Sequence, residues 1–303
     1  MEFSERRPRP LVLWALVATA IVAISCASIF IRLADAPAMT IAFYRVAIAA
    51  ALLAPGALPW RRRRNPPDPA PAVGGTVRNP VAMTLAAGAF LAGHFLFWIS
   101  SLQHTSVASS VALVSLTPLF AALISRAVLG ERPDRKLWCG LGVAILGSVA
   151  IAGIDLSLSI QSLHGDLLAL GGALAAAGYL LCGRTLRRSM GIAVYACSVY
   201  SAAALLLAAA GLAAAVPFSG FSGRTWIFLI LLALVPQLIG HTTFNWALRF
   251  LPATLVAVLT LGEPIGATVL AFLVLGESLS AAKGFGLGVL FAGIVLSSRG
   301  EAR

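Results

Sequence analysis

The chain alternates between long apolar runs and short polar connections. Ten of these runs are about 18–24 residues long. Each could cross the hydrocarbon layer of a bilayer as a helix rising about 1.5 Å per residue. The pattern therefore predicts an all-α membrane protein with ten transmembrane helices. The predicted spans are 11–31, 38–58, 81–102, 107–128, 137–154, 165–186, 192–215, 225–248, 252–275 and 281–298.

The second half of this pattern repeats the first. The proline, glycine and glutamate of the segment 116–131 recur 146 residues later in the segment 261–277. Three glycines of the fifth span recur in the tenth span at the same offset, and Gly93-His94 matches Gly240-His241 at an offset one residue longer. Since each copy holds an odd number of spans, the second copy enters the membrane from the opposite face, as in inverted-repeat transporters. The predicted repeats are 11–154 and 155–298.

Basic residues fix the expected orientation. Of the 22 Lys and Arg residues, 18 fall in the segments on the same side as the N-terminus, three fall on the other side, and Arg45 lies within a span. Cytoplasmic loops carry the excess of Lys and Arg. We therefore expect both termini, with the tails 1–10 and 299–303, to lie in the cytoplasm and the protein to reside in the cell inner membrane. The first run is too long for the apolar part of a cleaved signal peptide.

Composition excludes several classes of protein. Charged residues make up 11% of the chain and hydrophobic residues 59%, with a mean hydropathy of +0.93, whereas soluble domains contain about 25% charged residues. The net charge of +11 does not indicate nucleic-acid binding, because no soluble basic face exists to hold phosphates. The four cysteines lie in apolar runs without a CxxC spacing. They are interpreted as packing residues, and we expect no metal and no cofactor.

The longest connection, 59–80, carries Arg61–Arg64 and six prolines. Such a composition does not fold alone. We expect a disordered cytoplasmic linker that lies against anionic lipid; a binding role is the alternative.

Several short motifs resemble the drug/metabolite transporter superfamily, and within it the EamA family. They are Ser28–Arg32, Phe43-Tyr44-Arg45, the turns Thr117-Pro118 and Glu263-Pro264, and the Leu-Gly-Glu endings at 129–131 and 275–277. The resemblance covers the chain outside 59–80. It implies a ten-helix secondary carrier whose central cavity is lined by spans 1–4 and 6–9. Some members of the family are amino-acid exporters, and the third span here resembles theirs in its histidine and aromatic residues.

Ionisable residues inside spans are candidates for function because burying a charge in a membrane is costly. Glu263 lies half-way along its span before Pro264, which leaves a backbone carbonyl without its donor and could build an ion or proton site. Arg45 could hold a substrate carboxylate through two hydrogen bonds. The alternative for both is structural: the two charges pair, or Arg45 caps helix carbonyls. Pro118 and Pro264 are candidate hinges.

Histidines and aromatic residues extend the candidate site. His94 and His241 occupy equivalent repeat positions, and both would face the same cavity. Trp98 lies one helical turn after His94, and Asn245 one turn after His241, next to Trp246. Each of these residues could instead be ordinary packing. The remaining candidates to line a substrate cavity are Tyr44 and Tyr179.

Small residues at four-residue spacing occur in spans 5 and 10. They are Gly140/Ala144/Ser148 and Gly284/Gly288/Ala292. Such faces allow close helix approach. We expect spans 5 and 10 to pack together, and a homodimer contact is the alternative.

The sequence thus favours a secondary transporter that exports small organic metabolites, with neutral or aromatic amino acids as the favoured class. Its partners would be the solute and the lipid bilayer. Export of drugs or other metabolites is the alternative. A nucleotide-sugar or phosphate-ester antiporter would need more cavity cations than Arg45 alone. A lipid scramblase is an alternative function of a different class. An intramembrane enzyme would need a cluster of reactive side chains, and the sequence contains no catalytic motif.

Overall fold

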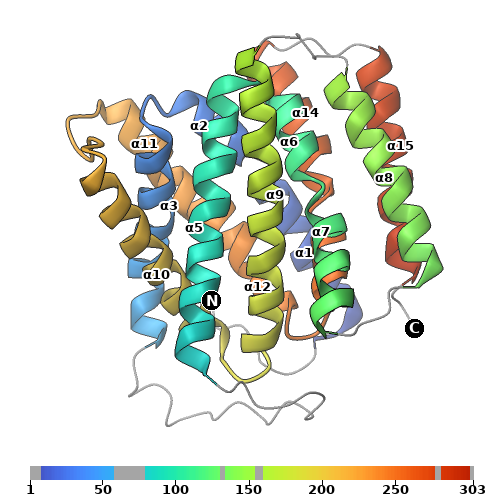
Figure 1. Ribbon diagram of the computed structural model, residues 1–303, viewed down its shortest axis with the longest axis horizontal. Helices are drawn as coiled ribbons and strands as arrows, with labels where there is room; N and C mark the ends of the chain where they lie inside the picture. The colour runs from blue at the N-terminus through green and yellow to red at the C-terminus, as the bar shows by residue number, and fades with distance from the viewer. Residues whose placement is uncertain (1–7, 58–78, 130–133, 154–159, 277–280, 301–303) are drawn as a thin grey trace.

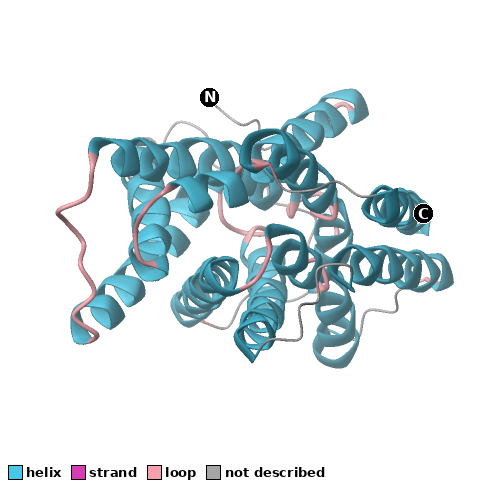
Figure 2. Ribbon diagram, turned by 90° about the horizontal axis from the view of Figure 1, so that it is seen from above, coloured by secondary structure: helices cyan, strands magenta, loops and turns pink. Residues whose placement is uncertain are grey.

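The computed structural model describes residues 8–57, 79–129, 134–153, 160–276 and 281–300, which form helices and short connections without any strand (Figures 1 and 2). The all-α prediction is confirmed for this part of the chain. In the first half the helices are α1 (Pro10–Ser25), α2 (Ala27–Leu33), α3 (Ala38–Ala57), α5 (Pro80–His104), α6 (Val107–Val114), α7 (Thr117–Ile124), the π-helix η1 (Ser125–Leu129) and α8 (Arg135–Gly153). In the second half they are α9 (Ile160–Leu186), α10 (Ile192–Ala213), α11 (Gly223–Leu232), the π-helix η2 (Ala233–His241), α12 (Thr242–Ala247), α13 (Ala253–Leu259), α14 (Gly262–Leu275) and α15 (Ala281–Gly300).

Within the described ranges, eight helical segments are long and apolar enough to cross a membrane. They are Pro10–Leu33, Ala38–Ala57, Pro80–His104, Val107–Val128, Leu163–Leu186, Ile192–Ala213, Gly223–Ala247 and Ala253–Leu275. The fifth and tenth predicted spans form the helices α8 and α15, of 19 and 20 residues, which fall outside this set. Most of the predicted linker 59–80, along with Gly130, Glu131 and Glu277 of the Leu-Gly-Glu endings, lies outside the described residues.

Two spans are interrupted where the sequence places a proline. Helix α6 gives way to α7 just before Pro118, and α13 gives way to α14 just before Pro264. Proline is tolerated in a first helical turn, where its missing N–H would have no partner. At each break a threonine hydroxyl donates to the carbonyl three residues earlier: Thr117 to Val114 at 2.7 Å, and Thr260 to Ala257 at 2.7 Å. The breaks are therefore built without leaving these carbonyls unsatisfied.

A third interruption lies in the span that begins with α11. Its middle nine residues form the π-helix η2, which contains Pro236. Because proline cannot donate a backbone hydrogen bond, the ladder is locally rearranged. Insertions of π-helix inside α-helices occur frequently at functional sites, and η2 carries both Gln237 and His241 into the interior.

The two halves of the chain are interleaved in one bundle. Helix α5 packs against α9 and α10, α3 packs against α10, and α1 packs against η2 and α14. Figure 1 shows α8 and α15 side by side at one edge of the bundle, so the predicted packing of spans 5 and 10 is confirmed. The polar interior is thus enclosed by helices from both halves.

The packed face of α15 differs from the predicted one. A Cβ atom at Gly147 would collide with the backbone of Leu290, and one at Gly293 would collide with the backbone of Ala144. By contrast, a Cβ at Gly284 or Gly288 would meet nothing within 4 Å. The predicted Gly284/Gly288 face was therefore wrong: four-residue spacing alone fits several faces of a glycine-rich helix.

The outer surface of the bundle is strongly apolar. Leu212 and Phe285 are each 73% exposed, and Leu273 is 68% exposed. Apolar surface of this extent on many helices is incompatible with water but suits lipid tails. The chain is accordingly a multi-pass membrane protein.

Candidate functional site

A completely buried arginine lies at the centre of the polar interior. Arg45 projects from the middle of α3, and its Nε donates a hydrogen bond to Oε1 of Gln237 on η2 at 2.8 Å. Its guanidinium carbon lies 4.1 Å from the ring centre of Phe95 and 5.7 Å from that of Trp98, both on α5. A cation over aromatic faces is stabilised by the ring quadrupoles. Three elements therefore hold the arginine in place.

Several hydrogen-bond donors around this arginine have no partner. They are both terminal nitrogens of Arg45, Nε2 of Gln237 and Nε1 of Trp98, all buried. An unmatched buried polar group costs about 1–3 kcal/mol, and a charged one costs more. Such a concentration of unmatched donors opposes stability. It is the arrangement expected of a binding site whose ligand provides hydrogen-bond acceptors.

The two repeat-related histidines meet beside the arginine. His94 packs parallel to Trp98, with ring centres 5.9 Å apart and planes 7° apart, and its ring centre lies 6.3 Å from that of His241. Phe95 contacts His241 edge-on at 5.3 Å. Nδ1 of His94 lies 3.0 Å from the carbonyl of Gly172 on α9, which orients the ring. The structure thus brings together four of the predicted residues: Arg45, His94, Trp98 and His241.

A chain of hydrogen bonds leads away from Gln237. The Thr242 hydroxyl donates to the carbonyl of Gln237 at 3.1 Å and lies 3.1 Å from the hydroxyl of Tyr200. Asn245 donates to the Tyr200 oxygen at 3.0 Å and accepts from the Tyr179 hydroxyl at 2.6 Å. The predicted residues Tyr179 and Asn245 therefore stand behind the arginine, connected to it through the residue that orients it.

Glu263 supplies the acidic group near this cluster. It lies in the first turn of α14, immediately after the break in its span, and is partly buried. The Glu263 carboxyl group lies within electrostatic range of Arg45, yet the terminal nitrogens of Arg45 make no hydrogen bond to it. The expected alternative of a closed Arg45–Glu263 pair is not the arrangement observed.

Two predicted residues lie apart from the cluster. The Tyr44 hydroxyl donates to the carbonyl of Phe218 at 2.6 Å, and its ring contacts Trp226 at 4.8 Å, so it ties α3 to the connection between α10 and α11. Trp246 contacts Phe250 edge-on at 5.1 Å. The candidate hinges Pro118 and Pro264 are buried at the two helix breaks.

Sequence reasoning missed Gln237, Phe95 and Tyr200. Gln237 had a detectable signal, since it is a polar residue that follows a proline inside an otherwise apolar run. Phe95 and Tyr200 had none, because an aromatic residue in a span is usually packing.

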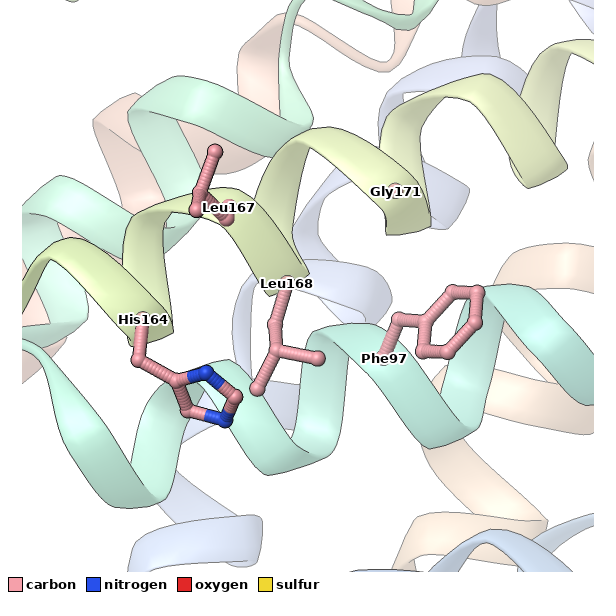
Figure 3. A pocket seen from close by; sticks show the side chains of 5 residues that line it. All are labelled: Phe97, His164, Leu167, Leu168 and Gly171. Atoms are coloured by element: carbon pink, nitrogen blue, oxygen red, sulfur yellow. The ribbon is translucent and has the colours of Figure 1, made fainter.

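A hollow of about 170 Å³ lies elsewhere, between α5 and α9 (Figure 3). Its lining residues are Phe97, His164, Leu167, Leu168 and Gly171. Phe97 is 40% exposed and Leu167 is 59% exposed, so this hollow opens on the outer surface of the bundle. Its mostly apolar lining contrasts with the donor-rich cluster around Arg45.

An apolar helical bundle with charged and aromatic groups enclosed at its centre is the architecture of a membrane transport protein. The chain belongs to the EamA-like transporter family, whose profile matches residues 9–153 and again residues 163–299. It is therefore a membrane transporter of small molecules. No cluster of three or more potential metal-ligating side chains occurs in the described part of the chain.

Individual relatives agree with this assignment. The chain is 26% identical to the uncharacterized transporter YxxF of Bacillus subtilis (strain 168) over 226 residues, covering 73% of this chain and 70% of that protein. It is 22% identical to an uncharacterized transporter of Archaeoglobus fulgidus, with coverages of 67% and 71%. A crystal structure at 20% identity superposes with a TM-score of 0.74, over 97% of this chain and 100% of the other, which shows the shared fold.

Proposed function

We propose that this transporter is a secondary carrier that exports small organic metabolites, with neutral or aromatic amino acids as the favoured class, across the inner membrane. The observation that carries the proposal is the completely buried guanidinium of Arg45, whose terminal nitrogens have no partner. Glu263 adds an acidic group to the same region. One guanidinium and one carboxyl group beside aromatic rings suit a zwitterion with an apolar side chain.

The proposal includes ten spans arranged as two inverted repeats, with α8 and α15 as the fifth and tenth spans. The repeated match of the family profile supports the duplication. A repeated contact supports it as well. Arg32, at the end of the first span, donates to the carbonyl of Thr105 after the third span at 2.8 Å; Arg184, at the end of the sixth span, donates to the carbonyl of Leu248 after the eighth at 2.7 Å.

Transport would proceed by alternating access around the arginine cluster. Arg45, His94, Trp98, His241 and Glu263 would contact the solute, while Tyr179 and Asn245 would support Gln237 from behind. The breaks at Pro118 and Pro264 would absorb the change in helix direction, since a broken ladder bends with less loss of hydrogen bonding. The basic side of the bundle, with both termini, would face the cytoplasm.

Glu263 is the proposed coupling residue. If it exchanges a proton during the cycle, Glu263→Gln should abolish the response of transport to an imposed pH gradient. The matched control is Asp35→Asn, because Asp35 is exposed outside the cluster. A Glu263→Gln protein that keeps the full rate and the full gradient response would show that coupling does not pass through this residue.

Counterflow in proteoliposomes tests the carrier function directly. Vesicles are loaded with one unlabelled candidate at a time, from neutral, aromatic, cationic and acidic amino acids, and accumulation of the labelled form is followed. Accumulation of neutral or aromatic amino acids is the expected result. Folded protein that accumulates no amino acid would refute this substrate class and direct the search to drugs and other metabolites.

A further inference from the structure

We infer that Gln237 is a specificity-determining residue that, together with Arg45, selects cargo bearing a single carboxylate. The inference rests on the proposed function, because it assigns a substrate group to the same site. It adds a residue that the repeat pattern did not reveal, and it makes the carboxylate, rather than the ammonium or the side chain, the group that the site recognises.

The amide of Gln237 has a fixed orientation. Its Oε1 accepts from Nε of Arg45 at 2.8 Å, so the NH2 group must be the other end of the amide. That Nε2 is buried and has no acceptor within normal hydrogen-bonding geometry, and the Tyr200 hydroxyl is a neighbouring polar group. The Gln237 carbonyl accepts from Thr242, which holds this turn of η2 in place. The side chain is therefore oriented and offers a donor.

The guanidinium of Arg45 is likewise left with one available edge. Its Nε is occupied by Gln237, and one face is covered by the Phe95 ring at 4.1 Å. The two terminal nitrogens lie on the remaining edge, in the plane of the group. A planar carboxylate meets such an edge with two parallel hydrogen bonds. Gln237 and Trp98, which both contact Arg45, each carry a further buried donor without a partner: Nε2 and Nε1.

Charge selects among anions. The groups without partners beside Arg45 are all donors, so the missing partner must be an acceptor. Arg45 supplies one positive charge, which matches a single negative charge on the ligand. A phosphate ester carries about two charges and would need additional cations. A monocarboxylate matches both the number of donors and the charge.

Thermal stabilisation of the purified full-length protein by matched probes tests this inference. The probes are L-phenylalanine and L-leucine, each paired with its carboxamide, together with 3-phenylpropionate and phenethylamine. We expect the carboxylates to stabilise the protein and the carboxamides and the amine to have little effect. Equal stabilisation by acids and carboxamides, or no stabilisation by any carboxylate, would overturn the inference.

Substitutions identify the residue responsible. Gln237→Glu replaces the free donor with an acceptor that pairs with Arg45, and Gln237→Met removes the donor while keeping the volume. Both should weaken carboxylate binding by at least about tenfold. The matched control is Gln103→Glu, since Gln103 is exposed at the end of α5 and donates to Ala36. Folded Gln237 variants that bind carboxylates as the unsubstituted protein does would refute the role of Gln237.

The outcome is separable from that of the proposed function. Carboxylate binding that depends on Gln237 without any counterflow would uphold the recognition site and refute the carrier. Counterflow of amino acids and their carboxamides at equal rates would uphold the carrier and refute carboxylate selection.

Discussion

Two arginines are completely buried in the described part of the chain, and their surroundings differ. Arg187, just after α9, donates through Nε to the carbonyl of Asn245 at 3.1 Å and through a terminal nitrogen to the carbonyl of Met190. Arg45, in the middle of α3, has one acceptor for its Nε and none for its terminal nitrogens. The side chains are chemically identical, but one is matched to backbone acceptors and the other is not.

The difference supports a structural role for Arg187 and the proposed substrate-binding role for Arg45. Carbonyls near helix ends lack intrahelical donors, so Arg187 satisfies groups that would otherwise be unpaired. The unmatched donors of Arg45 oppose folding, and this cost would be offset by an acceptor that the proposed substrate supplies. Both regions meet at Asn245, whose side chain belongs to the hydrogen-bond chain behind Gln237 while its carbonyl belongs to Arg187.

The largest effect should come from Arg45→Met. Losing two charge-assisted hydrogen bonds to the solute should lower the initial counterflow rate by about 100-fold or more. The melting temperature in detergent should stay unchanged or rise, because a buried charge without partners is replaced by an apolar side chain. Arg224→Met, at an exposed position, is the control. Near-normal transport by Arg45→Met, together with a strongly lowered melting temperature, would show that Arg45 is a structural residue.

Arg187→Met should show the opposite pattern. Two backbone carbonyls lose a charged donor, so the free energy of unfolding should fall by about 2–3 kcal/mol. Denaturation followed by circular dichroism measures this change. The counterflow rate per folded molecule should remain close to that of the unsubstituted protein, and a rate as low as that of Arg45→Met would contradict a purely structural role.

His94→Ala should have a smaller effect on binding. Removing a ring that packs on Trp98 and faces His241 should cost about 1 kcal/mol, or about fivefold in substrate affinity. The concentration dependence of counterflow gives this affinity. An unchanged affinity in folded protein would place His94 with the structural residues.

Tyr44→Phe should have the smallest effect. The hydroxyl donates to the Phe218 carbonyl away from Arg45, so its loss should lower stability by about 1 kcal/mol and leave transport unchanged. Thermal melting and counterflow on the same preparation separate the two effects. A substantial loss of transport would show that the site extends past Arg45 toward Tyr44.

The helical architecture was accessible from the sequence because apolar run length is a direct consequence of bilayer thickness. Each of the ten predicted runs coincides with helix, although eight segments meet the requirement for spanning. The break at Cys26 and the π-helix η2 were not foreseen. At such irregularities, neighbouring helices and side chains replace the backbone hydrogen bonds that are lost. The hydropathy of a single sequence does not reveal these contacts.

The ionisable residues of the candidate site could be predicted from the sequence, whereas its geometry could not. Arg45, His94 and His241 stand out because ionisable side chains are rare inside spans. Tyr44 was predicted to line the same cavity as Arg45, but adjacent residues on a helix point about 100° apart. Only the tertiary structure shows that Arg45 faces the interior while Tyr44 faces the connection after α10.

The close contact between α8 and α15 has a mechanical consequence. At Gly147 and Gly293 the two backbones meet without an intervening side chain, and these helices belong to different family-matched segments. Contacts made by long side chains can yield by changing rotamer, whereas backbone against backbone cannot. If the two segments rotate against each other, as the proposed alternating access requires, the displacement should be smallest at this edge and should increase with distance across the bundle.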